Sequence, residues 1–183
     1  MIPSFTRDHT TFMGAADNKL DADVFGDNGP PVLLLHGGGQ TRHAWRSTAE
    51  KLASKGYTAY ALDQRGHGTS EWVANGAYEF WDFSADLKLV ATEITCRSGV
   101  KPIVVGASLG GIAALLGEGE PKRANDAHLF SALCINRPIF NVSVSKKRLK
   151  AEDGCGLVFL AADRSSSRSR SLITLASSLA RHI

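Results

Sequence analysis

The segment of this 183-residue chain whose residues most clearly suggest a chemical reaction is a serine between glycines. Gly106, Ser108 and Gly110 form a G-x-S-x-G pattern between an aliphatic stretch and a helix-like stretch, the setting in which such a serine is a nucleophile. Glycines are needed here because side chains would collide with backbone in so tight a turn. Backbone N–H groups at the start of the next helix would point at the reacting atom. We therefore expect Ser108 to attack a carbonyl group; the alternative is an ordinary glycine-rich helix start.

A second glycine-rich segment, His36-Gly37-Gly38-Gly39-Gln40, can supply the electrostatic part of the same reaction. A carbonyl oxygen that gains negative charge is stabilised by N–H groups that converge on it. Gly38 can turn its N–H inward because it has no side chain, and Leu109, directly after the serine, would supply the other N–H. The spacing fits neither glycine-rich phosphate motif. We therefore predict an oxyanion hole at Gly38 and Leu109, against the alternative of a flexible turn.

A third glycine-rich loop, Asp63-Gln64-Arg65-Gly66-His67-Gly68-Thr69-Ser70, is expected to support the site rather than to react. Asp63 and Arg65 can bond neighbouring backbone and each other. His67 does not stand where a catalytic base is expected. His36 precedes the oxyanion loop, and we expect it to bond backbone and to keep that loop in shape.

The apolar stretches between these loops predict the elements that position them. We expect a hairpin over residues 10–25 and strands at 32–35, 57–62 and 103–105. We expect helices over 41–55, from Asp82 or Ser84 to Gly99, and from the glycine-rich segment 106–111 to about residue 116. Strands that alternate with helices predict a mostly parallel sheet with helices on both faces. Each glycine-rich loop leaves the carboxyl end of a strand, so the three loops should meet at one edge of the sheet.

The segments HGGGQTRHAW, ALDQRGHGTS and VGASLGG, in this order, resemble the α/β-hydrolase fold family, in particular bacterial esterase and peroxidase-like members with an HGGG oxyanion loop. The resemblance covers about residues 10–135. It implies hydrolysis of esters, thioesters, amides or related acyl compounds through an acyl-enzyme on Ser108, with no cofactor. A serine at this position differs from the carboxylate that the epoxide hydrolases and haloalkane dehalogenases of this fold use.

The resemblance fades after residues 131–135, which are similar to the sixth strand of the family. The family order is serine, then acid, then histidine, and Asp163 with His182 is a pair that respects it. Asp163 follows the strand-like residues 156–160, and His182 follows the strand-like residues 172–175. His182 is the penultimate residue, however, and chain ends usually fray. Our hypothesis is therefore that truncation or a frame shift near residue 140 has removed the catalytic second half, and a triad of Ser108, Asp163 and His182 is the alternative.

The charge distribution divides the chain at a similar place. Residues 1–119 hold 10 Lys and Arg against 13 Asp and Glu, a net charge of −3, and residues 120–183 hold 11 against 5, a net charge of +6. We therefore expect a hydrolase-fold core at 1–135 and a basic, Ser/Arg-rich, partly disordered segment at 136–183. The run at 164–171 has no interleaved aromatic residues, so we expect no nucleic-acid partner.

The remaining composition excludes several other classes of protein. The longest aliphatic run of the first half falls far short of the ~20 residues of a membrane span, and the N-terminus lacks the apolar region of a signal peptide. Three cysteines, Cys96, Cys134 and Cys155, form no C-x-x-C pair, so we expect reduced, mostly buried thiols and no metal site. These features favour a cytoplasmic location.

The sequence as a whole predicts a serine hydrolase of small-molecule esters or related acyl compounds, inactive if its second half is missing. The alternative is a non-catalytic hydrolase-fold protein that binds a ligand or a partner. A gene remnant that does not fold stably is the third hypothesis, because an incomplete sheet would expose an apolar edge. The oligomeric state is left open.

Overall fold

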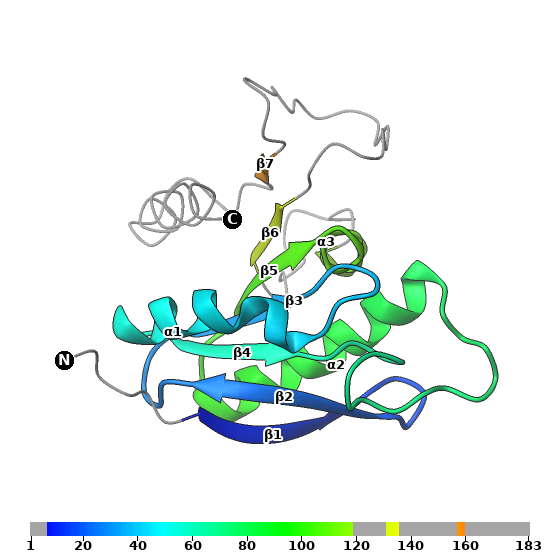
Figure 1. Ribbon diagram of the computed structural model, residues 1–183, viewed down its shortest axis with the longest axis horizontal. Coiled ribbons are helices and arrows are strands. Elements are labelled where there is room, and N and C mark those ends of the chain that lie inside the picture. Colours follow the sequence, from blue (N-terminus) through cyan, green and yellow to red (C-terminus); the bar gives the residue numbers. More distant parts are fainter. Residues whose placement is uncertain (1–6, 119–130, 136–156, 160–183) are drawn as a thin grey trace.

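The apolar runs of the sequence form neighbouring strands of one sheet. The computed structural model describes residues 7–118, 131–135 and 157–159. Within these ranges, strands are hydrogen-bonded in the order β1-β2-β4-β3-β5-β6-β7 (Figure 1). Their bounds are Arg7–Met13 (β1), Lys19–Phe25 (β2), Pro31–Leu35 (β3), Thr58–Leu62 (β4), Ile103–Ala107 (β5), Ser131–Ile135 (β6) and Leu157–Phe159 (β7).

The centre of the sheet is parallel, as the sequence predicts. Strand β3 pairs in parallel with β4 and β5, and β5 pairs in parallel with β6. The predicted hairpin of β1 and β2 adds an antiparallel edge next to β4, and β7 is antiparallel to β6. The strands expected at 131–135 and within 156–160 are therefore present. The strand expected at 172–175 lies outside the described residues, and the division of the chain at residue 135 stays a prediction.

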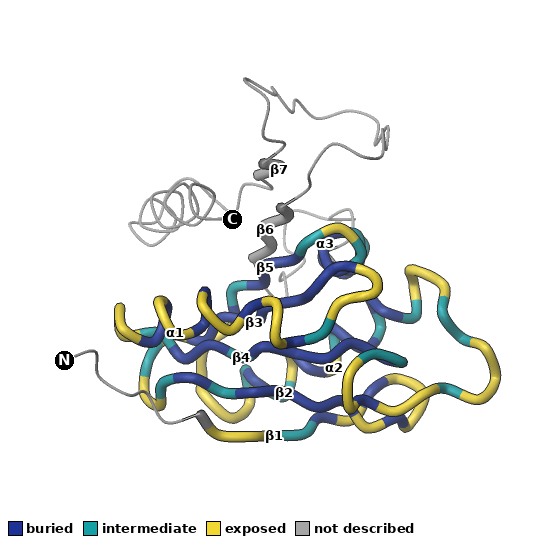
Figure 2. The backbone as a smooth tube through the Cα atoms, viewed as in Figure 1, coloured by how far each residue is buried: buried dark blue, intermediate teal, exposed yellow. Residues whose placement is uncertain are grey.

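Helices cover both faces of the sheet, which confirms the predicted fold class. A short 3-10 helix, η1 (Arg42–Trp45), leads into α1 (Arg46–Ser54) on one face. Helices α2 (Phe80–Ser98) and α3 (Leu109–Glu118) pack on the other face. In Figure 1, α1 lies in front of the strands and α2 behind them. Figure 2 shows that the strands between the helices are the most buried part of the described chain.

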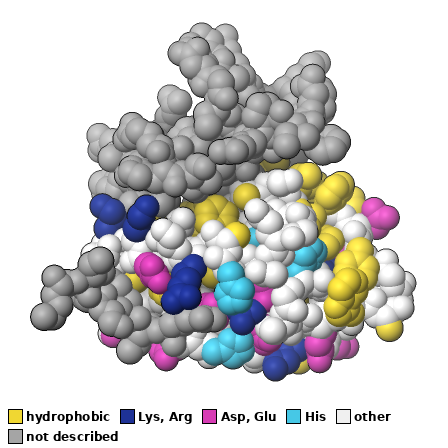
Figure 3. Space-filling model, viewed as in Figure 1, with side chains coloured by type: hydrophobic (Ala, Val, Ile, Leu, Met, Phe, Trp, Pro, Cys, Tyr) yellow, Lys and Arg dark blue, Asp and Glu magenta, His cyan; other side chains and the backbone are white. Residues whose placement is uncertain are grey.

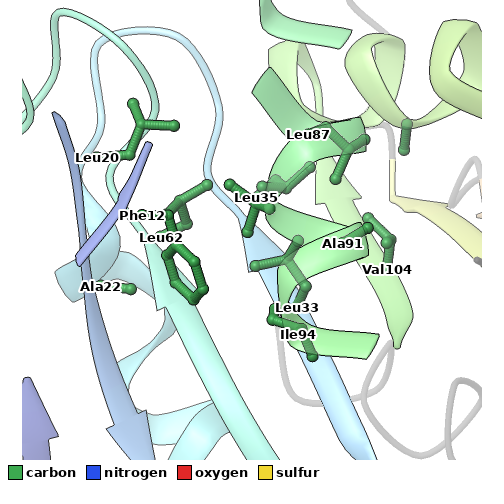
Figure 4. Packing of buried hydrophobic residues seen from close by; sticks show 12 residues of the cluster. Phe12, Leu20, Ala22, Leu33, Leu35, Leu62, Leu87, Ala91, Ile94 and Val104 are labelled. Carbon is green, nitrogen blue, oxygen red and sulfur yellow. The ribbon is translucent and has the colours of Figure 1, made fainter. Parts of the chain in front are cut away.

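Strand β3 lies between the two helical layers, and its side chains divide between two cores. Val32 and Leu34 join the core beneath α1, whereas Leu33 and Leu35 join the core beneath α2 and α3. Figure 4 shows the second core, where strand side chains meet those of α2. Each of these β3 side chains is at most 1% exposed, and burying one contributes roughly 1.5–3 kcal/mol. The continuous aliphatic run of the sequence is thus explained by burial on both faces.

Helix α2 begins earlier than the sequence predicts. Its N-cap is Glu79 rather than Asp82 or Ser84, and Asp82 is instead the third helical residue. The two acidic residues form a capping box, in which the Asp82 carboxylate accepts the Glu79 N–H at 2.8 Å. The spacing of apolar residues in the sequence marks only the buried face of the helix. It does not indicate this extra turn, because the side chains of Phe80 and Trp81 are 48% and 67% exposed. Gly99 ends the helix with φ 71°, as expected.

The described surface carries charges of both signs. In the space-filling view, basic, acidic and histidine side chains are interspersed over the face that is shown (Figure 3). None of the helices within the described ranges has the combination of length and apolar character that crossing a bilayer requires.

Candidate active site

The three glycine-rich loops meet at one edge of the sheet, as predicted. Leu35, near the end of β3, pairs with Leu62 at the end of β4 and with Gly106 of β5, so the parallel strands end nearly level. His36, the next residue, joins the loops. Its carbonyl oxygen accepts the Gln64 Nε2–H at 2.7 Å and the Gly110 N–H at 3.2 Å. One fully buried residue thus links all three loops.

The ring of His36 is also held by backbone, which agrees with its expected structural role. Its Nδ1–H donates to the carbonyl oxygen of Gly37 at 2.8 Å, and its Nε2 accepts the Gln64 N–H at 3.1 Å. Burial lowers the pKa of His36, and the nearby His67 adds to that effect. The ring is therefore neutral with a defined tautomer, and it holds loops in place.

Ser108 lies on the turn between β5 and α3 in a strained conformation. Its φ is 47°, in the left-handed region that residues with a side chain seldom adopt, and the residue is exposed. The turn is tight because a Cβ on Gly110 would lie 2.5 Å from Leu35 Cβ, and one on Gly106 would collide with the backbone of Gly110. The glycines on both sides of Ser108 are therefore required by close backbone contacts, as the sequence predicts.

The loop after β3 holds most of its own amides in hydrogen bonds. The Gly37 N–H donates to Gln40 Oε1 at 3.0 Å, and the Gln40 N–H donates to Gly37 O at 3.1 Å. The Gly39 N–H faces His67 Nε2 at 3.4 Å. Within residues 7–118, the Gly38 N–H has no acceptor, although the amides on both sides of it are bound.

The Gly38 amide is not alone at this edge of the sheet. A Cβ on Gly38 would lie 4.0 Å from Leu109 Cβ, and one on Gly37 would lie 3.5 Å from Ser108 Cβ, so the two loops are in contact. Leu109 is the first residue of α3, whose opening N–H groups have no partner within the helix. Two amides without a hydrogen-bond partner among the described residues, one from the loop after β3 and one from the start of α3, thus lie beside Ser108 at the positive end of a helix dipole.

The loop after β4 is fixed by two buried ion pairs. Asp63 accepts from the Arg42 backbone N–H at 2.6 Å and pairs with the Arg42 guanidinium. Arg65 binds Asp86 of α2 in a bidentate pair, with Nε–Oδ2 at 2.7 Å and Nη2–Oδ1 at 2.6 Å. The expectation that Asp63 and Arg65 bond each other is therefore wrong. The expectation that they bond backbone is confirmed, since Asp63 also accepts from Thr69 N, and Arg65 donates to the Ala77 carbonyl.

Both arginines remain charged although they are buried. Burial alone would lower the pKa of Arg42 and of Arg65, but hydrogen bonds and charge attraction from their aspartates raise both pKa values above the ordinary one. Because each cation lies directly on a carboxylate, these pairs are rigid supports for the loops that surround Ser108.

Other candidate residues of the sequence lie apart from this site or outside the described residues. Asp163 and His182 are outside them. No histidine within residues 7–118 has a hydrogen bond to Ser108 in the structure. Cys96 on α2 is exposed, so the expectation of buried thiols is wrong for that residue. No group of three or more His, Cys, Asp or Glu side chains in the described part is arranged to hold a metal ion.

Sequence reasoning missed three supporting residues of the site. Gln40 closes the loop after β3, Arg42 neutralises Asp63, and Asp86 neutralises Arg65. The only signal for Gln40 is its position directly after the glycine triplet. The two ion pairs each join residues 21 positions apart in the chain, and no local pattern indicates them.

Comparison with known proteins finds relatives of part of this chain. An esterase of Mycobacterium tuberculosis is 38% identical over 96 residues, which are 52% of this chain and 30% of that protein. A non-heme chloroperoxidase of Kitasatospora aureofaciens is 34% identical over 107 residues, 57% of this chain and 38% of that protein. An epoxide hydrolase structure from Vigna radiata superposes with a TM-score of 0.59 at 24% identity, over 70% of this chain and 39% of that one.

The chain spans between 30% and 39% of the length of these three proteins. The likeness to the Vigna radiata structure, at 24% identity, supports the fold alone. A match to the alpha/beta hydrolase fold family extends over residues 30–137, which is more than half of this chain and includes all three loops. The chain therefore belongs to the alpha/beta hydrolase fold family.

Proposed function

We propose that this chain carries the nucleophile and the oxyanion hole of a serine hydrolase that acts on small-molecule esters or related acyl compounds. The observation that carries the proposal is the exposed, strained Ser108 beside two amides, those of Gly38 and Leu109, that have no acceptor among the described residues. A hydroxyl next to converging N–H groups is suited to attack on a carbonyl whose oxygen becomes negative.

In the proposed reaction, Ser108 Oγ attacks the acyl carbonyl carbon while a base takes its proton. The carbonyl oxygen gains negative charge and accepts hydrogen bonds from Gly38 and Leu109; such a donor is worth ~3 kcal/mol of barrier. Collapse of this intermediate releases the alcohol, which receives the proton, and leaves an acyl-enzyme. Water then attacks the acyl group while the same base takes a proton from the water. The bond between the acyl carbon and Ser108 Oγ breaks, the base returns that proton to Oγ, and the carboxylic acid leaves.

Within this chain the candidate for the base is His182, oriented by Asp163, because this pair follows Ser108 in the chain order of the family. No cofactor is needed for this chemistry. The name of the Mycobacterium tuberculosis relative, an esterase, supports an ester as substrate. The serine at position 108 argues against an epoxide, because the epoxide hydrolases of this fold use a carboxylate nucleophile.

Labelling with a fluorophosphonate probe tests the proposal, because the probe reacts covalently with an activated serine. We expect the full chain to be labelled and Ser108→Ala to lose labelling. Ser47→Ala removes an exposed serine of α1 and serves as the matched control, which should be labelled like the wild type. Folded wild type that resists the probe would contradict catalysis and favour the alternative of a non-catalytic binding protein.

A second variant tests the proposed base. His182→Ala should lose the labelling of Ser108, because serine reacts slowly without a group that takes its proton. Unchanged labelling in His182→Ala would remove His182 from the mechanism while leaving Ser108 as the nucleophile.

A further inference from the structure

The histidine of the loop after β4, His67, has no part in the reaction proposed above, yet it contacts the tip of the oxyanion loop. We propose that His67 is a positioning residue, whose Nε2 accepts the Gly39 N–H and thereby holds the neighbouring Gly38 N–H towards the reacting oxygen. This inference rests on the proposed function, because it concerns the oxyanion hole formed by Gly38 and Leu109.

The hydrogen bonds of His67 require one tautomer. Its Nδ1 lies 2.9 Å from the carbonyl oxygen of Arg65. A carbonyl oxygen only accepts, so Nδ1 carries the proton and Nε2 of the neutral ring is left as an acceptor. The Gly39 N–H faces that acceptor at 3.4 Å. The contact to Arg65 thus prepares the ring for the contact to Gly39.

The ring of His67 lies next to two other rings. Its centroid lies 4.9 Å from that of His36 and 6.4 Å from that of Phe83. Both neighbours are buried, and His36 is itself locked by hydrogen bonds. Arg65, which supplies the carbonyl acceptor, is 1% exposed and bound to Asp86. His67 is therefore a rigid point from which the loop tip can be held.

Hydrogen bonds hold each of the two peptide groups that meet at Gly38, the first from within the loop and the second from His67. In the first, the Gly37 carbonyl accepts from His36 Nδ1 and from Gln40 N, so the Gly38 N–H of the same trans peptide points away from them. In the second, the Gly39 N–H is held by His67. These two anchors together fix the backbone of Gly38 on both sides.

The loop tip needs such an anchor because it has little other support. Gly38 and Gly39 are exposed, and Gly39 has φ 74°. Among the described residues, nothing lies within 4 Å of a Cβ built on Gly39. A run of glycines is conformationally permissive, so an unanchored tip would spread over several backbone conformations. Without His67, the Gly38 N–H would point at the reacting oxygen for only part of the time.

The tautomer of His67 tests the geometry without any need for catalysis. Long-range proton–nitrogen NMR spectra of the full chain distinguish the two neutral forms of each imidazole. We expect His67 to be protonated on Nδ1 at a pH where the ring is neutral. Protonation on Nε2 would overturn the proposal, because that nitrogen cannot then accept the Gly39 N–H.

Labelling kinetics test the effect on the reaction. His67→Phe keeps a ring but removes the acceptor, and we expect its maximal rate of fluorophosphonate inactivation to fall about 10-fold, less than the ~10²-fold or more that loss of a whole oxyanion donor causes. The probe concentration at half-maximal rate should not change. His67→Gln places an amide oxygen near the position of Nε2 and should restore the rate to within about twofold. The control is His43→Phe, which removes an exposed histidine of η1 and should behave like the wild type.

The outcomes separate this inference from the function on which it rests. Labelling of the wild type with an unchanged rate in His67→Phe overturns the positioning role alone. Equal losses of the labelling rate in His67→Phe and His67→Gln overturn it as well, because they would indicate a general disturbance of the loop. A folded wild type that is not labelled overturns the proposed function and this inference together.

Discussion

At the scale of single residues, strain at Ser108 distinguishes the site from the rest of the structure. Among the described residues, the only non-glycine residues with positive φ are Asp17, at 55°, and Ser108, at 47°. Asp17 lies in the turn of the β1–β2 hairpin, where aspartate tolerates this region. Ser108 has no such local reason, and the left-handed conformation costs roughly 1–2 kcal/mol for a residue with a Cβ. The fold retains this strain where the reactive hydroxyl is expected.

Replacement of Ser108 by two small residues measures that strain. Ser108→Gly should be more stable than Ser108→Ala by about 1 kcal/mol, because glycine adopts positive φ without steric penalty. Urea unfolding of the two variants gives the difference. At Lys51, an exposed position inside α1, the order should reverse, with the glycine variant less stable than the alanine variant by about 1 kcal/mol. Equal stability of the two Ser108 variants would show that the turn is not strained.

The proximity of Ser108, Gly38 and Leu109 could be predicted from sequence because local chain geometry determines where each of them lies. A tight turn needs the glycines around Ser108, and Leu109 follows by position alone. The partners of Arg42 and Arg65 could not be located in this way. Their carboxylates, on Asp63 and Asp86, reach them only after β4 and α2 have docked. The local sequence therefore predicts the turn and the loop that bring Ser108 and Gly38 together, but not the charged pairs that support them.

At the scale of elements, the pair Arg65–Asp86 fastens the loop after β4 to helix α2. Arg65 is 1% exposed and Asp86 4% exposed, so neither charge has compensation from bulk water. The guanidinium also donates to the Ala77 carbonyl, and the Asp86 carboxylate accepts from Ala15 N. The pair thus joins the β1–β2 turn, the loop after β4 and the helix in one network.

Loss of the Asp86 charge should destabilise the fold strongly. Asp86→Asn is expected to lower the free energy of unfolding by about 3 kcal/mol or more, because it leaves a buried cation without its counter-charge. A guanidinium keeps its proton at all ordinary pH values, so deprotonation cannot relieve the loss. Glu93→Gln breaks an exposed pair with Arg97 on the same helix and should cost less than about 1 kcal/mol. Chemical denaturation compares the two, and similar losses would contradict this account.

Local patterns predicted the existence of the elements better than their pairing. The aliphatic run at 32–35 and the apolar period ending at Gly99 are local signals, and both elements formed. The start of α2 differed because the capping box of Glu79 and Asp82 overrides the apolar period. The position of β4 between β2 and β3 depends on contacts between distant segments, and no single stretch of sequence records them.

At the scale of the whole molecule, His36 is the buried point where three loops and three parallel strands meet. Burial lowers its pKa, so the folded protein binds a proton to this ring less readily than the unfolded chain does. The unfolded chain therefore binds more protons below about pH 6.5, the ordinary pKa of histidine. The contribution of neutral His36 to stability is complete above that pH and is lost as the pH falls towards the folded-state pKa.

Unfolding measured across pH tests this linkage. We expect the stability difference between wild type and His36→Gln to be constant above about pH 6.5 and to shrink below it, by at most ~1.4 kcal/mol per pH unit. The comparison cancels the titration of the other histidines, which both proteins share. A difference that grows as the pH falls would mean that the folded protein favours a charged His36, contrary to its burial.

The tryptophans of this fold divide its optical signal between core and surface. Trp45 is 5% exposed in the core beneath α1, whereas Trp72 and Trp81, in and after the loop that follows β4, are 77% and 67% exposed. The emission of the two exposed indoles is already that of residues in water, so unfolding changes it little. The blue-shifted part of the native fluorescence comes from Trp45. A quencher in solution should first remove the emission of Trp72 and Trp81. Fluorescence therefore reports the packing of the α1 face separately from the surface beyond β4.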